Sequence, residues 1–175
     1  MNLLNSEASI AKNNQPGVTV INPSAIYNLR MELESIFNAF QDIAQQKGVK
    51  LSLSFAAEMT VAYWDLVSLH KHVLNNILSI VLCHTKIGGQ IAISIRKSDE
   101  YTMNFYISNP NSLSVAENEH ALCSDIEFDE ANNCNSGLSM AQRYVQAHQG
   151  TLVWTQKASE LGFEIELPLY RLCLT

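Results

Sequence analysis

The chain of 175 residues carries little charge and has no basic cluster. Charged residues make up 16% of it, and the formal net charge of −6 is spread along the sequence. A nucleic-acid or anionic-membrane surface needs clustered Lys and Arg side chains. We therefore expect no nucleic-acid partner.

Long apolar runs are also missing. No uninterrupted apolar stretch approaches the roughly 20 residues that cross a bilayer. The first residues, MNLLNSEASIAKNN, lack the basic start and apolar middle of a signal peptide. These absences predict a cytoplasmic protein that does not bind membranes.

The four cysteines include no CxxC pair. They lie far apart in the sequence, at Cys83, Cys123, Cys134 and Cys173. This spacing does not match a zinc site or a dense disulfide framework. We expect reduced thiols, packed mostly as small hydrophobic side chains.

The apolar content is enough for one sizeable core. Hydrophobic residues make up 47% of the chain, and this length predicts one domain rather than two. Residues 1–17 are polar and aperiodic and end in Gln-Pro-Gly, so we expect a mobile leader there. The domain is expected over residues 18–175.

Apolar periodicity predicts alternating strands and helices. The expected elements are a strand at 18–21, a helix from about 26 to 47, a strand at 51–55, a helix from Asp65 to about 86, a hairpin of 90–97 and 101–108, a long loop at 109–135, a helix at 136–150, and strands at 151–156 and 163–170. This order predicts a two-layer α/β sandwich, with a mixed, mostly antiparallel sheet and three main helices on one face.

A polar stripe follows the second predicted helix. At about 100° per residue, a narrow sector contains His72, Asn76, Ser79 and Cys83. One interpretation is that these side chains face water or a covering loop. The other is that they line a remodelled pocket for another ligand or a peptide, because pockets persist on folds after their chemistry is lost.

The order of elements, with a long loop before the last helix, resembles the ATP-binding domain of sensor histidine kinases and the GHKL ATPase superfamily. Trp64-Asp65 and LVSLHKHVLNNIL resemble its helix with a leading Gly-Asp, and Thr85 and Gly88-Gly89 resemble the exit of that helix. FYISNPN lies where the Asp-x-Gly strand end belongs, NSGLSMAQRYVQAHQG resembles the glycine-rich last helix, and GFEIELPL resembles the terminal strand. The resemblance covers roughly residues 18–170 and implies the fold described above.

Several positions depart from the pattern that the resemblance implies. The family's Mg²⁺-binding Asn is replaced by Ile80, which has no oxygen for a hard cation. The basic position that follows is Cys83, while Asn76 keeps one amide of the family's helix.

The adenine and phosphate positions depart as well. The adenine-binding Asp is replaced by Asn109, which offers no charge, and the Gly two residues later is replaced by Asn111. In the glycine-rich box, whose backbone N–H groups cradle phosphate, only Gly137 remains, between Asn135 and Ser139.

These departures predict an ATPase fold that has lost ATP and Mg²⁺ binding, so no cofactor is expected. The leading hypothesis is a non-catalytic, pseudokinase-like signalling domain that binds another protein, such as a sensor kinase or a response regulator, with a homodimer also open. One alternative is a divergent ATP-binding serine kinase of the anti-sigma-factor type. Another is a histidine phosphotransfer accessory subunit.

Other patterns in the sequence do not support a phosphoacceptor histidine, a zinc site or a calcium-binding loop. None of the five histidines has the sequence context of a phosphoacceptor, and His120, Cys123 and Cys134 match no common zinc spacing. The acidic run from Asp125 to Glu130 lacks the ligand rhythm of an EF-hand. It is expected to be a solvated face of the long loop.

Overall fold

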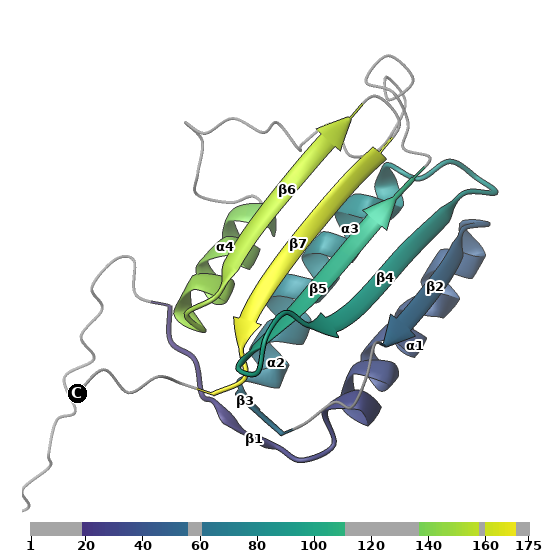
Figure 1. Ribbon diagram of the computed structural model, residues 1–175. Helices are drawn as coiled ribbons and strands as arrows, with labels where there is room; N and C mark the ends of the chain where they lie inside the picture. The colour runs from purple at the N-terminus through teal and green to yellow at the C-terminus, as the bar shows by residue number, and fades with distance from the viewer. Residues whose placement is uncertain (1–18, 56–60, 111–136, 158–159, 171–175) are drawn as a thin grey trace, which may run out of the picture.

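A five-stranded sheet forms one layer of the structure, and helices cover one of its faces (Figure 1). The computed structural model describes residues 19–55, 61–110, 137–157 and 160–170. The strand order is β2-β4-β5-β7-β6, in which β2 and β4 are parallel and the other neighbours are antiparallel. The strands are β2 (Lys50–Phe55), β4 (Gln90–Lys97), β5 (Thr102–Asn109), β6 (Thr151–Lys157) and β7 (Glu160–Pro168).

Three helical stretches in the described part of the chain pack on this sheet. They are α1 (Leu29–Gln46), a continuous helix made of α2 (Leu66–Ser68), the π-helical η1 (Leu69–Leu74) and α3 (Asn75–Cys83), and α4 (Gly137–Ala147). Asn28 caps the start of α1, and Gly48 follows its end with a φ of 67°, which favours glycine. The predicted two-layer sandwich, with a mixed sheet and three main helices on one face, is confirmed.

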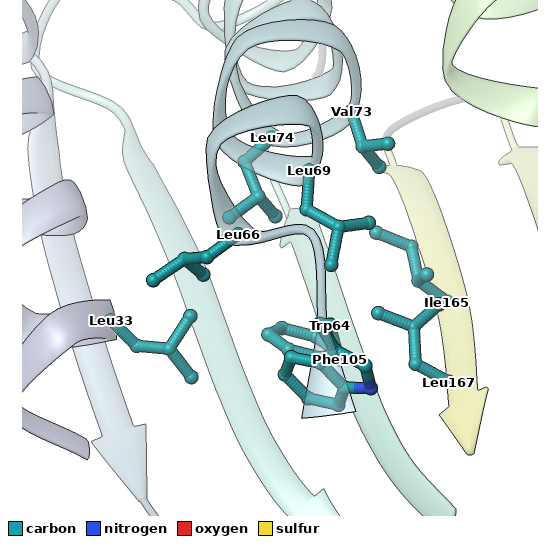
Figure 2. Close-up of a pocket in the computed structure, with 9 residues that line it drawn as sticks. All are labelled: Leu33, Trp64, Leu66, Leu69, Val73, Leu74, Phe105, Ile165 and Leu167. Atoms are coloured by element: carbon teal, nitrogen blue, oxygen red, sulfur yellow. The ribbon is translucent and has the colours of Figure 1, made fainter. Parts of the chain in front are cut away.

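The core lies between the sheet and the helices. Alternation along β4 and β5 turns Ile91, Ile93, Ile95, Met103, Phe105 and Ile107 toward the helices, and all six are buried. Burial of each such side chain contributes about 1.5–3 kcal/mol. The packing leaves an apolar cavity of about 10 Å³ beneath α2, where Trp64 and Phe105 lie side by side with ring centroids 6.0 Å apart (Figure 2).

The central helix is unusually apolar. Residues Leu66–Cys83 have a mean hydropathy of 1.3 over 18 residues, which by length and composition alone would suffice to cross a membrane. Here its apolar side packs into the core, with Ile77, Leu78 and Val81 fully buried. Core helices and membrane spans share this composition, so the hydropathy does not distinguish between them.

The predicted strand at 18–21 is wrong over its described residues, 19–21, which form no strand. Instead β1 (Ser24–Ile26) pairs antiparallel with β3 (Ala62–Trp64), which was not predicted. Ile26 therefore belongs to a strand, and α1 begins later than its apolar pattern indicates. Strand formation depends on a pairing partner more than on β-branched residues alone.

Asp65 joins three separate segments. Its carboxylate accepts hydrogen bonds from the backbone N–H of Asn22 (2.8 Å) and from Ser68, and its own backbone N–H donates to His148 Nε2 (3.1 Å). Burial by itself raises the pKa of Asp65, but the hydrogen bonds from Asn22 and Ser68 and the nearby His148 together outweigh it, so the pKa is lowered from its ordinary 3.8. Asp65 thus caps the start of the helix that the sequence predicts from this residue.

Candidate functional site

The first residue of the polar stripe, His72, faces helix α4. The ring of His72 stacks on the ring of Tyr144 of α4, with centroids 4.3 Å apart and planes 12° from parallel. Stacked aromatic pairs of this kind contribute packing energy beyond the area they bury. His72 is thus a packing residue between two helices.

Asn76 lies against the start of α4. Its Nδ2 donates to the carbonyl oxygen of His72 (2.8 Å), which holds the amide along its own helix. A Cβ added at Gly137 would come within 3.1 Å of Asn76 Cγ and Oδ1. Glycine at position 137 therefore allows a close approach of two helices at this point.

Ile80 and Cys83 continue along the same helix. Ile80 is buried, with 6% of its surface exposed, whereas Ser79 beside it is exposed. Cys83 is half-buried and disulfide-bonded, so the expectation of a reduced thiol is wrong at this position. Spacing along the sequence did not indicate this, because folding brings distant cysteines together.

Asn109 is fully buried at the end of β5. Its Nδ2 donates to the carbonyl oxygen of His84 (2.9 Å) and to Thr85 Oγ1 (2.8 Å), and the Thr85 hydroxyl in turn donates to the carbonyl oxygen of Val81 (2.7 Å). A backbone carbonyl only accepts hydrogen bonds, so the amide orientation of Asn109 is determined. Any further hydrogen bond of this side chain is accepted by its Oδ1.

Of the remaining predicted nucleotide-pocket positions, Ser139 is the one in the described part of the chain. Ser139 is half-buried on α4. The other predicted positions lie outside the described residues, and these are Asn111, Asn135, His120, Cys123, Cys134 and the acidic run Asp125–Glu130. Among the residues that the structure describes, no group of three His, Cys, Asp or Glu side chains is placed to hold a metal ion.

Asn76 and Ile80 lie on α3, Gly137 of α4 lies against Asn76, and Asn109 at the end of β5 is bonded to the end of α3. Ile80 offers only aliphatic carbon, and the Asn109 amide hydrogens are bonded to the end of α3. At these four positions, the side-chain oxygens that could bind a hard cation are the amide oxygens of Asn76 and Asn109.

Comparisons with known proteins identify the architecture. No protein-family model matches the chain. The catalytic domain of histidine kinase ThkA superimposes with a TM-score of 0.66 at 16% identity, covering 85% of this chain and 97% of that domain. A histidine kinase from Burkholderia phymatum gives a TM-score of 0.68 at 15% identity, covering 86% of this chain and 72% of that structure. This is the histidine kinase ATPase-domain fold.

The chain is also similar in sequence to a curated protein. The sensor histidine kinase CusS of Escherichia coli is 27% identical over 169 residues, which is 90% of this chain. The chain spans only 32% of the length of CusS. ThkA has also been solved in complex with the response regulator protein TrrA. The similarity is therefore to the kinase-like domain of signal-transduction proteins, and the resemblance predicted from the sequence motifs is confirmed.

The structure adds contacts that sequence reasoning did not find within this histidine kinase ATPase fold. The motif positions Thr85 and Asn109 are hydrogen-bonded to each other, and Gly137 meets Asn76. The only sequence signal for either contact was that both residues of each pair belong to motifs of one family. The stacking of His72 on Tyr144 likewise joins two of these motif segments, and nothing in the sequence indicated that the two rings meet.

Proposed function

We propose that this chain is a non-catalytic, pseudokinase-like domain that acts in signal transduction by binding another protein. The observation that carries the proposal is Ile80, a buried aliphatic side chain at the position where the family's helix holds Mg²⁺. A hard cation needs oxygen ligands, which this side chain does not have.

Two further contacts support the same proposal. Both amide hydrogens of Asn109 are bonded to the end of α3, so this residue stabilises the fold at the adenine position. Gly137, the remaining glycine of the phosphate box, packs against Asn76. Each of these residues thus has a structural reason for its identity that does not involve nucleotide.

The proposed partner is a sensor kinase or a response regulator, and the proposed location is the cytoplasm. The similarity to ThkA, a kinase solved together with a response regulator, supports this choice of partner. The proposed domain extends over residues 18–175, with residues 1–17 as a leader. Self-association into a homodimer belongs to the same proposal.

Isothermal titration calorimetry tests the loss of nucleotide binding. The full chain is titrated with Mg-ATP and with Mg-ADP, beside a histidine kinase catalytic domain that has all its motifs. We expect no binding heat, which at usual protein concentrations means a Kd weaker than about 1 mM. Micromolar binding that depends on Mg²⁺ would overturn the proposal.

The orientation of Asn109 favours a second candidate, a divergent ATP-binding protein serine kinase. Because its NH₂ group is turned toward His84 and Thr85, the acceptor Oδ1 is the atom that would meet an adenine amino group. This candidate predicts transfer of label from γ-labelled ATP to a serine of a candidate protein partner. If no label is transferred and Mg-ATP gives no binding heat, the second candidate is excluded and the first proposal stands.

A further inference from the structure

A groove of about 300 Å³ separates α1 from the start of the central helix. Glu32, Ser35, Ile36 and Ala39 form its α1 wall. They are spaced three, four and seven residues from the first, so they share one face of that helix. The groove is far along the central helix from Ile80, on the side facing α1, whereas His72 and Asn76 face α4.

The opposite wall is formed by Leu66 and Val67 of α2 and by His70 of η1. Val67 is 77% exposed although it is aliphatic. Together with Ile36 and Ala39 it gives the groove an apolar floor and edge that open to solvent. An open groove between two helices is a shape that receives a third, amphipathic helix.

The polar side chains around the groove have no partners within the described part of the chain. Glu32 and Ser35 are exposed and His70 is half-buried, and none of the three side chains makes a hydrogen bond or an ion pair there. On the neighbouring turn of α1, by contrast, Glu34 is paired with Arg30 at 2.8 Å. Within the described residues, Glu32 therefore presents a negative charge without an ion-pair partner beside an apolar floor.

This combination determines the chemistry of the occupant. The volume is at the lower limit of about 300–1,000 Å³ seen for small-molecule sites. Among the described residues that line the groove, Glu32 is the one carboxylate. Aliphatic anchors spaced along a helix fit the floor, and a Lys or Arg beside them pairs with Glu32. A basic amphipathic helix of a protein partner satisfies both features.

Leu66 connects the groove to the interior. It lines the groove. It also lines the small apolar cavity whose wall includes Trp64 and Phe105 (Figure 2). A side chain inserted into the groove therefore presses on Leu66, and the environment of Trp64 changes with it. The buried indole is thus a built-in reporter of occupancy.

We infer that the α1–α2 groove is the docking site for a basic amphipathic helix of a protein partner. The inference rests on the proposed function, since it specifies where that protein-binding domain binds its partner. It adds the surface, the secondary structure of the bound segment and the sign of its charge.

A pair of synthetic helical peptides tests it on the full chain. Both are about 18 residues long, which is five helical turns, with Leu at three- and four-residue spacing. One carries Lys beside the Leu face and the other carries Glu at the same positions. Binding is measured by anisotropy of a labelled peptide and by Trp64 fluorescence in a Trp154→Phe background. We expect the basic peptide to bind, to shift the Trp64 emission and to move the NMR signals of Ile36, Leu66 and Val67.

Two variants locate the binding. Val67→Glu is expected to weaken binding of the basic peptide by at least about tenfold, because it places a charge on the apolar edge. Ile87→Glu is the matched control, since Ile87 is also an exposed aliphatic residue (89%) but does not line the groove. Glu32→Lys is expected to weaken the basic peptide and strengthen the acidic one by about two- to fivefold, as for an exposed ion pair.

The inference is overturned if the two peptides bind equally or not at all, or if Ile87→Glu matches Val67→Glu. It is also overturned if Val67→Glu abolishes self-association of the chain in sedimentation, since the occupant is then a second copy. Failure of the proposed function is a separate result, because Mg-dependent ATP binding would be seen in calorimetry whether or not the peptide binds. If neither ATP nor peptide binds, the docking inference is refuted and the proposed loss of nucleotide binding stands.

Discussion

Asn109 and Thr85 are joined by a buried hydrogen bond in which the asparagine amide donates to the threonine hydroxyl across 2.8 Å. The second amide hydrogen goes to the carbonyl oxygen of His84. The end of β5 and the end of α3 are thereby held together by one side chain, at the place where the resemblance to histidine kinases implies adenine recognition.

Restoring the family's acid at this position is expected to destabilise the chain. In Asn109→Asp both donated hydrogens are lost, and a carboxylate oxygen lies against the carbonyl oxygen of His84 in a fully buried site. We expect a loss of roughly 3 kcal/mol in the free energy of unfolding by urea at pH 7, and no gain of Mg-ATP binding. Asn109→Ala, which removes the bonds without adding the charge, should cost less. Equal costs would contradict the assigned orientation.

Restoring the metal-binding amide is also expected to fail. Ile80→Asn places a polar group in the core, and we expect a loss of roughly 3 kcal/mol in unfolding free energy. Calorimetry should still detect no Mg-ATP binding, because the adenine and phosphate positions remain altered. Ile80→Val is the control for volume alone, at about 0.5–1.5 kcal/mol. Recovery of ATP binding by Ile80→Asn alone would refute our interpretation of the other positions.

The contact between Gly137 and Asn76 predicts energetic coupling. Alanine in place of glycine in a helix normally stabilises it by up to about 1 kcal/mol. In Gly137→Ala this gain should be absent, because the new Cβ meets Asn76 at 3.1 Å. The double variant with Asn76→Ala should regain it. A double-mutant cycle by urea unfolding should give a coupling of about 0.5–1 kcal/mol, and a coupling near zero would show that Asn76 simply moves aside.

Asp65 predicts an acid dependence of stability. Its pKa is lowered in the folded state from the ordinary 3.8. The carboxylate therefore stabilises the fold fully above about pH 3.8, and this contribution is lost as the pH falls through the lowered pKa. Urea unfolding between pH 7 and pH 3 should show the wild type converging on Asp65→Asn at the acid end. A constant difference between the two would mean that the carboxylate charge makes no contribution.

Hydrophobic periodicity correctly predicted the elements whose structure is determined by one segment alone. The apolar spacing of α1 and the alternation of the β4–β5 hairpin predicted elements that the structure confirms. It did not predict structure that depends on two segments far apart in the sequence, such as the pairing of β1 with β3. The disulfide of Cys83, the groove between α1 and α2 and the orientation of the Asn109 amide depend in the same way on partners that are distant in sequence.

The candidate site was predicted by family resemblance rather than by periodicity. Asn109 of β5 is bonded to the end of α3 and Gly137 of α4 meets Asn76, but neither contact was predictable from the sequence. Gly137 was interpreted as a remnant of a phosphate box, and the structure shows that it also makes space for Asn76. A glycine kept for close packing and one kept for phosphate binding are identical in sequence.

The π turn at Leu69–Leu74 has a consequence for the whole central helix. A π turn contains one residue more than an α turn, so the two halves of this helix are rotated relative to an uninterrupted α-helix by about 100°. Removing one residue from η1 would turn Leu66 and Val67 away from α1 while Ile77 and Ile80 kept their places over the sheet. A single inserted residue therefore determines which way the groove faces relative to Ile80.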